Sequence, residues 1–156
     1  MKKILLVVMM AASVGTFAET RNTSELVVSF LPSDINLNPL KSFTSTEAQI
    51  YTALYEGLVG YDPASLEPIP AAARSWDVSP DGKTYTFRIR DDARYWNGDP
   101  VTAEDFRSSW LKFLDPAVQA EYSFFYDVIE GARDYRTGKN PDPASVKIRV
   151  LSPKRL

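Results

Sequence analysis

A four-residue turn signal followed by a strictly alternating segment places the strongest constraint on how this chain folds. Residues 79–82 read Ser-Pro-Asp-Gly, which favours a tight turn because proline fixes φ and glycine tolerates positive φ. Over residues 84–90, Tyr85, Phe87 and Ile89 then alternate with polar side chains. A period of two residues is typical of a strand with one buried face. The pattern therefore predicts a strand over residues 84–90 that follows a turn.

Two segments have apolar residues at helical spacing and a residue suited to start a helix. The first begins near Thr46, runs for about three turns and has Ser45 or Thr46 as its candidate N-cap. Its apolar positions are Ile50, Ala53, Leu54 and Leu58. The second follows Thr102, which resembles a capping box with Asp105, and ends before Asp115. Both segments predict amphipathic helices.

The remaining segments complete a mixed order of strands and helices. An apolar run over residues 26–31 and an alternating run over residues 146–151 each predict a strand. Helical spacing predicts a third helix over residues 122–136, with Gly138 placed to terminate it. Residues 61–80 hold four prolines and are predicted to be mostly irregular. The resulting order of strand, helix, strand, helix, helix and strand indicates the α+β class.

The chain contains neither cysteine nor histidine. Without them it can form no disulfide, no thiolate metal site and no histidine-dependent catalytic triad. Carboxylates remain as candidate catalytic or metal-binding groups, and the adjacent pairs are Asp91-Asp92 and Glu104-Asp105. Both pairs sit beside turns or helix caps, where acidic residues are common. We therefore predict that the chain is not an enzyme and takes no cofactor or metal.

The overall composition is that of a globular protein, with 44% hydrophobic and 24% charged residues. The net charge is −2 and no block of like charges occurs. Nucleic acids and anionic membrane surfaces attract clustered positive charge, so neither is an expected partner.

The first eighteen residues have the features of a cleavable signal peptide. Lys2 and Lys3 precede an apolar run over residues 4–12, and Thr16 and Ala18 place small residues at positions −3 and −1 of a cleavage site after Ala18. An uncleaved anchor is the alternative, but the apolar run is shorter than the roughly 20 residues that span a bilayer. Because no cysteine is available for lipid attachment, we expect a periplasmic protein.

An ordered set of motifs over residues 73–110 resembles the bacterial extracellular solute-binding proteins of family 5. The set comprises Ala-x-Ser-Trp, the Ser-x-Asp-Gly turn, an aromatic-rich strand ending in basic residues, Trp-Asn-Gly-Asp-Pro-Val-Thr-Ala, Asp-Phe and Ser-Trp. Flanking matches to the family pattern are Leu37-Asn38-Pro39, Leu54-Tyr55-Glu56-Gly57-Leu58 and Leu114-Asp115-Pro116. Residues 129–132 and the Gly138-Lys139 pair look most like the oligopeptide-binding branch.

The resemblance implies an α+β fold of the periplasmic binding protein type, class II. It implies a copy truncated to the N-terminal part of lobe I and the small domain that follows. The expected divisions are a signal peptide over 1–18, the first strand and loop of lobe I over 19–45, a small α+β domain over 46–145, and the start of a return strand over 146–156. Val146, Ile148 and Val150 share one face of that strand, and we expect this face to lack a cover.

The resemblance also implies the substrate-binding component of an ABC-type oligopeptide importer. Its expected partners are an oligopeptide ligand and the membrane permease subunits. Two alternatives remain open: a dipeptide- or nickel-type solute-binding protein of the same family, and a truncated receptor that binds no ligand and acts as an interaction protein.

Tyr122 is the candidate ligand-binding residue. By its position after Asp115-Pro116 it resembles a tyrosine that faces the buried peptide in oligopeptide-binding proteins, and its ring and hydroxyl suit a peptide amide. The alternative is a core tyrosine beside Phe124, Phe125 and Tyr126. A second ligand-lining loop of the family often offers an acidic group, which residues 41–45 lack. The large aromatic residues expected to build the fold instead are Trp76, Trp96, Phe106 and Trp110.

Overall fold

The computed structural model describes residue 29 and residues 35–41 and 44–156. All the described residues except Ser29 belong to one compact unit over residues 33–156. The predicted signal peptide and the strand predicted over residues 26–31 lie outside the described residues, Ser29 excepted.

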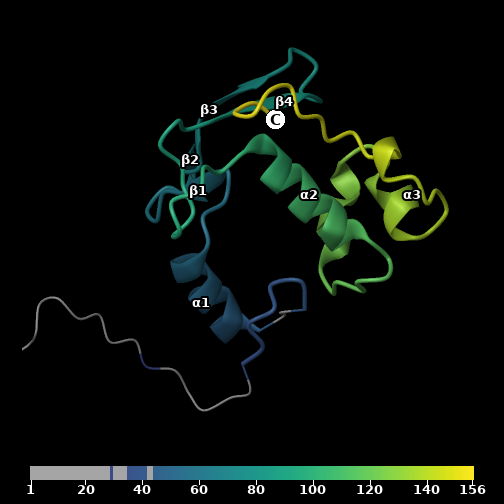
Figure 1. Cartoon of the computed structure of the whole chain (residues 1–156), viewed down its shortest axis with the longest axis horizontal. Coiled ribbons are helices and arrows are strands. Elements are labelled where there is room, and N and C mark those ends of the chain that lie inside the picture. Colours follow the sequence, from purple (N-terminus) through teal and green to yellow (C-terminus); the bar gives the residue numbers. More distant parts are fainter. Residues whose placement is uncertain (1–28, 30–34, 42–43) are drawn as a thin grey trace, which may run out of the picture. The chain divides into compact units, whose positions relative to one another are not determined.

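The central hairpin joins β3 (Ala73–Val78) to β4 (Tyr85–Ile89) as an antiparallel pair (Figure 1). The turn between them closes through a hydrogen bond of 2.9 Å from Gly82 N to Ser79 O, and Gly82 has a φ of +70°. The turn and the strand predicted over residues 84–90 are thus confirmed. Burial along the strand is graded, however, because Ile89 is fully buried whereas Tyr85 is exposed.

The prediction that residues 61–80 are mostly irregular is wrong. This region supplies β3 and most of a second hairpin, in which β1 (Val59–Tyr61) pairs antiparallel with β2 (Pro68–Pro70). Proline lacks an N–H donor and is tolerated on an edge strand, where that donor would face away from the partner. Since β2 has β1 as its single partner in the described sheets, its two prolines are compatible with pairing.

The first predicted helix exists as α1 (Ser45–Leu54), but its cap and its buried face differ from the prediction. Thr44 is the N-cap and forms a capping box with Glu47, one residue before the predicted candidates. Of the predicted apolar positions, Leu58 lies beyond the end of α1 and is buried in the core, whereas Leu54 on the helix itself is 63% exposed. The buried residue of α1 is Glu47, which is 2% exposed.

The second predicted helix is confirmed as α2 (Ala103–Leu114). Thr102 is its N-cap, and both hydrogen bonds of the capping box with Asp105 are present. Ala103 and Leu114 at its two ends are fully buried, and Phe106 and Trp110 pack against the core from the same helix.

The single helix predicted over residues 122–136 is instead two short elements. A 3-10 helix, η1 (Ser123–Val128), is followed by α3 (Ala132–Arg136). Gly131 separates them with a φ of +83°, a left-handed conformation that ends a right-handed helix. A Cβ at Gly131 would lie 2.2 Å from Ser145 O, so this close approach requires glycine.

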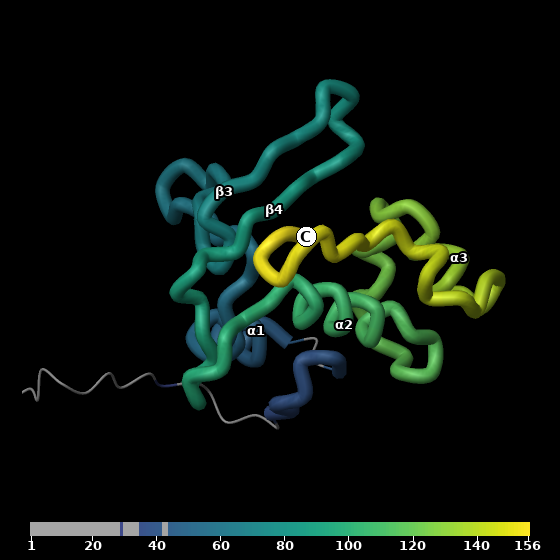
Figure 2. The backbone as a smooth tube through the Cα atoms, turned by 45° about the horizontal axis from the view of Figure 1, so that its top comes forward, coloured from purple at the N-terminus to yellow at the C-terminus, as the bar shows by residue number. Residues whose placement is uncertain are grey.

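The C-terminal segment differs from the prediction both in its secondary structure and in its burial. After the short 3-10 helix η2 (Pro143–Ser145), residues 146–151 form no strand. Val146 and Ile148 are nevertheless buried in the core, so the expectation of an uncovered face is wrong for both. In addition to β3, the last few residues lie along β4, where Phe87 and Leu156 exchange backbone hydrogen bonds of 2.9 and 3.2 Å (Figure 2).

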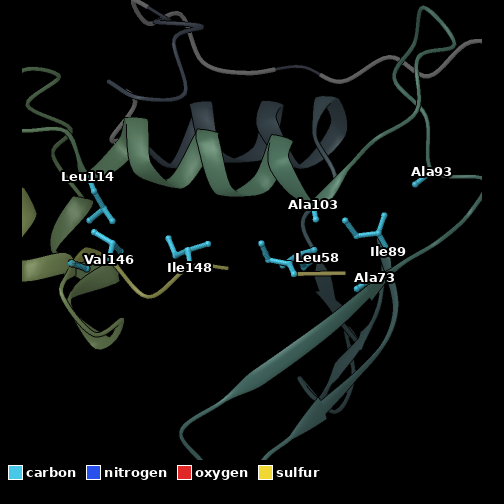
Figure 3. Packing of buried hydrophobic residues seen from close by; sticks show 10 residues of the cluster. Leu58, Ala73, Ile89, Ala93, Ala103, Leu114, Val146 and Ile148 are labelled. Atoms are coloured by element: carbon cyan, nitrogen blue, oxygen red, sulfur yellow. The ribbon is translucent and has the colours of Figure 1, made fainter. Parts of the chain in front are cut away.

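One core cluster connects the hairpin, α2, α3 and the C-terminal segment. Figure 3 shows Leu114, Val146 and Ile148 toward one end of α2, and Ala103 with Ile89 toward the other. The complete cluster is Leu58, Ala73, Ile89, Ala93, Ala103, Leu114, Ala132, Val146, Ile148 and Leu156. None of the helices in the described residues has both the length and the apolar character of a membrane span.

Trp96 does not build the fold. Its side chain is 99% exposed, because it occupies the second position of a turn closed by a hydrogen bond of 2.9 Å from Gly98 N to Tyr95 O. Trp76, Phe106 and Trp110 are each half-buried, in agreement with a structural role.

Candidate functional site

Three exposed aromatic side chains gather at η1, which begins beside Tyr122. We call Tyr122, Phe124 and Phe125 the η1 aromatic cluster. The ring centroids of Phe124 and Phe125 are 4.5 Å apart, and the ring of Tyr122 stacks on that of Phe125 at 5.8 Å. The three side chains are 39%, 48% and 64% exposed, respectively. A group of exposed aromatic rings is a candidate for a binding surface.

The opposite side of η1 faces the protein core through Tyr126. Its ring meets that of Phe113 at 5.2 Å and that of Trp110 at 5.7 Å, both edge to face. Burial raises the pKa of the Tyr126 hydroxyl. Tyr126 is half-buried and packs against the core cluster, whereas Tyr122 is neither a member of that cluster nor among the residues packed against it.

An ion pair fixes η1 against α3. Arg136 donates two hydrogen bonds to the carboxylate of Asp127, of 2.9 Å from Nε and 2.7 Å from the terminal nitrogen. This bond lowers the pKa of Asp127. Paired geometry of this kind is the stronger form of an arginine–carboxylate contact. The η1 aromatic cluster thus rests on an element with a well-defined position.

A shallow recess of about 300 Å³ lies beside the η1 aromatic cluster. Its lining residues are Asp115, Pro116, Gln119, Ala120, Glu121, Ser123 and Arg136. Glu121 and Ser123 on either side of Tyr122 line it, and Tyr122 itself does not. The structure therefore places Tyr122 with the aromatic rings on η1 rather than inside this polar recess.

The loop before α1 reaches the loop after α2. Lys41 Nζ donates hydrogen bonds to Val118 O and, at 3.5 Å, to Gln119 O. The two segments are distant in sequence, and the acceptors precede Tyr122 by four and three residues.

An acidic residue that the sequence analysis missed organises the loop before α1. The carboxylate of Glu47 accepts hydrogen bonds from Asn36 N at 2.7 Å and from Thr44 N at 3.1 Å. The Thr-x-x-Glu spacing of a capping box is the signal that could have identified it. The carboxylate oxygens of Glu47 already accept hydrogen bonds from backbone N–H groups, so Glu47 stabilises the loop. It does not substitute for the acidic group that residues 41–45 lack.

The two carboxylate pairs considered as catalytic candidates are engaged in structural contacts. Asp91 and Asp92 bind Arg74 and Arg90 at 3.1 and 3.3 Å, respectively. Glu104 binds Arg107 at 3.0 Å. Asp105 accepts a hydrogen bond from Thr102 N at 2.7 Å as part of the capping box. No group of three acidic residues suited to a metal ion occurs within residues 35–41 and 44–156.

Comparison with known proteins gives a consistent match. Residues 67–155 match the family described as bacterial extracellular solute-binding proteins, family 5 middle. The dipeptide-binding protein DppE of Bacillus subtilis is 40% identical over 124 residues, which cover 78% of this chain and 22% of DppE.

Solved structures of peptide-binding proteins share the fold of this segment. The crystal structure of Haemophilus influenzae OppA in complex with RPPGFSPFR matches with a TM-score of 0.70 and 38% identity, over 76% of this chain and 23% of that one. The Escherichia coli murein tripeptide binding protein MppA matches with a TM-score of 0.72 and 31% identity, over 77% and 23%. This chain therefore spans less than a quarter of the length of the proteins that it matches.

Proposed function

The chain belongs to the bacterial extracellular solute-binding proteins of family 5, and from this premise we propose that it serves peptide binding in an ABC-type oligopeptide importer. The relatives are named as binding a dipeptide, an oligopeptide or a murein tripeptide. All of these ligands present peptide amides, so a short peptide is the ligand class that they share. The permease subunits of the importer are the proposed membrane partners.

The observation that carries the proposal is the η1 aromatic cluster at the predicted ligand residue. Tyr122 combines an apolar ring with a hydroxyl that can form a hydrogen bond with a peptide amide. Phe124 and Phe125 extend this surface with two further exposed rings. We propose that Tyr122 contacts the peptide and that the neighbouring rings receive an apolar part of it.

We further propose that the chain binds its ligand without transforming it. The support is chemical: the chain has no cysteine or histidine, and its adjacent carboxylates are occupied by arginines or by a helix cap. Binding needs only shape, apolar surface and hydrogen bonds, which the η1 aromatic cluster can offer.

Periplasmic export is the proposed route to the site of action. Its support is the sequence of the first eighteen residues together with the names of two relatives, OppA of Haemophilus influenzae and OppA of Escherichia coli, which are described as periplasmic. N-terminal sequencing of the protein from a periplasmic fraction should begin at Glu19. Recovery of the protein from the cytosol with Met1 intact would contradict export.

An NMR titration of the isotope-labelled chain with tri- to pentapeptides tests the proposed site. We expect saturable shift changes centred on Tyr122, Phe124 and Phe125. Tyr122→Ala should abolish most of these shift changes. Tyr122→Phe distinguishes the contribution of the hydroxyl to peptide binding from that of the ring. Tyr61→Ala is a matched control, because Tyr61 is an exposed tyrosine on β1.

Three results would count against the proposal. Absence of any peptide-dependent shift would contradict peptide binding by this chain and favour an interaction protein. Saturable shifts with Ni²⁺ in place of peptide would favour the nickel-type alternative. An equal effect of Tyr61→Ala and Tyr122→Ala would contradict a specific role for Tyr122.

A further inference from the structure

We propose that Lys41 is a positioning residue for the Tyr122 site: its ammonium group ties the segment after α2 to the loop before α1. This inference rests on the proposed function, because it assigns Lys41 to the same site. Its structural basis is separate, namely a contact between residues 77 positions apart in the sequence.

The contact consists of charge-assisted hydrogen bonds to two consecutive carbonyl groups. Lys41 Nζ donates to Val118 O and, at 3.5 Å, to Gln119 O. An ammonium group is a compact charge with three donors, so it can serve both carbonyls at once. Hydrogen bonds with an ionised donor are also stronger than those between neutral groups.

The Lys41 end of this contact is held by α1 through a series of hydrogen bonds. Asn36 N donates to the buried carboxylate of Glu47 at 2.7 Å, and Asn36 O accepts from the Tyr51 hydroxyl at 2.7 Å. Asn38 N donates to Asn36 Oδ1 at 3.0 Å, and Lys41 N donates to Asn38 O at 2.9 Å. The backbone of Lys41 therefore has a defined position relative to α1.

The other hydrogen bonds of the segment that receives the ammonium are local. In the described part of the chain, Ala117 N and Val118 N donate to Asp115 Oδ1 and O at 2.9 and 3.0 Å, and Ser123 N and Oγ donate to Ala120 O at 3.2 and 2.7 Å. Gln119 has a φ of +52°, which is unfavourable for a residue with a β-carbon. A strained backbone persists where surrounding contacts hold it, and Lys41 supplies such a contact at the strained residue.

Tyr122 follows Gln119 by three residues, so the tether acts close to the ligand site. If the segment relaxes, the backbone that leads into η1 is no longer held in one conformation. The ring of Tyr122 then no longer has a single orientation. Lys41 thus acts through the backbone and needs no contact with the ligand.

Hydrogen exchange of the unliganded chain tests the tether itself. Lys41→Met removes the ammonium and keeps a similar stem, and we expect exchange at the amides of Val118 and Ser123 to become about tenfold faster, with little change in α2. Lys41→Arg keeps a charged donor and should retain much of the protection. Lys83→Met is the matched control, since Lys83 is an exposed lysine in the β3–β4 turn whose side chain forms no ion pair among the described residues. Unchanged exchange in Lys41→Met, or equal acceleration in Lys83→Met, would overturn the tether.

Peptide titration of the same variants tests the positioning role. We expect the peptide-dependent shifts at Tyr122 to need at least several-fold more peptide in Lys41→Met and to recover in Lys41→Arg. A wild-type response at Tyr122 in Lys41→Met, despite faster exchange, would overturn the role in positioning. If the wild-type chain shows no response to peptide, the proposed function is contradicted instead. The hydrogen-exchange rates then still test whether Lys41 tethers the segment after α2.

Discussion

Asp127 and Arg136 form a two-bond ion pair that joins η1 to α3, with N–O distances of 2.9 and 2.7 Å. The pair lies nine residues apart in the sequence and spans the left-handed turn at Gly131. It therefore holds together the two elements into which the predicted helix over residues 122–136 is divided.

This ion pair predicts a loss of stability in acid. The hydrogen bond from Arg136 lowers the pKa of Asp127 in the folded state. Its contribution is therefore complete above the unfolded-state pKa of about 3.9 and is lost as pH falls through the lower folded-state value. Asp127→Asn should reduce the dependence of the unfolding free energy on pH below about 4, measured by urea unfolding at several pH values. Asp91→Asn is the control, because its ion pair with Arg74 is largely exposed, and an equal effect there would argue against Asp127.

Gly131 and Gly138 both have a left-handed backbone near α3, but replacing each with alanine should lower the unfolding free energy by very different amounts. Gly138 has a φ of +72° with nothing within 4 Å of the position that a β-carbon would take, so Gly138→Ala should cost only the backbone strain of about 1–2 kcal/mol. Gly131→Ala adds a clash with Ser145 O at 2.2 Å and should cost at least twice as much. Thermal unfolding of both variants measures the difference. Similar melting temperatures would contradict the close packing of Gly131 on Ser145.

The capping box of α2 predicts a defined contribution from Thr102. Thr102→Ala removes the acceptor for Asp105 N and should lower the unfolding free energy by about 1 kcal/mol. Ser109→Ala lies on the exposed side of the same helix and should change stability by less than about 0.5 kcal/mol. Chemical denaturation of the two variants provides the comparison. A neutral Thr102→Ala would show that the cap is dispensable.

The exposure of Trp96 predicts that its removal leaves the fold intact. Trp96→Ala should change the unfolding free energy by less than about 0.5 kcal/mol, since nothing is uncovered when an exposed side chain is removed. Trp110→Ala should cost about 2 kcal/mol or more, because Trp110 packs on the core and on Tyr126. Tryptophan fluorescence during unfolding monitors both variants through the tryptophans that remain. A large loss in Trp96→Ala would mean that this side chain is covered in solution.

Local signals in the sequence were sufficient to predict elements whose turn or capping residues lie within a few positions of one another. The Ser79–Gly82 turn, the strand that follows it and the capped helix from Thr102 were all predicted correctly. Each depends on residues within a few positions of one another, such as a proline and glycine in a turn or a threonine three residues before an acid. The resemblance of residues 73–110 to the solute-binding family uses the same local patterns and is confirmed by the family match.

Errors arose where a distant segment decides the outcome. Local proline content suggested that residues 61–80 are irregular, but β4 and β1 provide partners that turn parts of this region into strands. Trp96 was expected inside because tryptophan usually packs, and its turn position exposes it instead. Gly131 interrupts an otherwise helical pattern because the backbone of Ser145 passes directly against it.

Sequence patterns alone predicted the family and the class of fold, and they singled out Tyr122, which we propose contacts a peptide. The packing of the whole segment was needed to place Tyr122 with Phe124 and Phe125 on an exposed surface, to set Tyr126 against the core cluster, and to bring Lys41 to the carbonyls before Tyr122. Periodicity and capping act within a few residues, whereas the buried side of a short 3-10 helix depends on the helix and loops that pack against it.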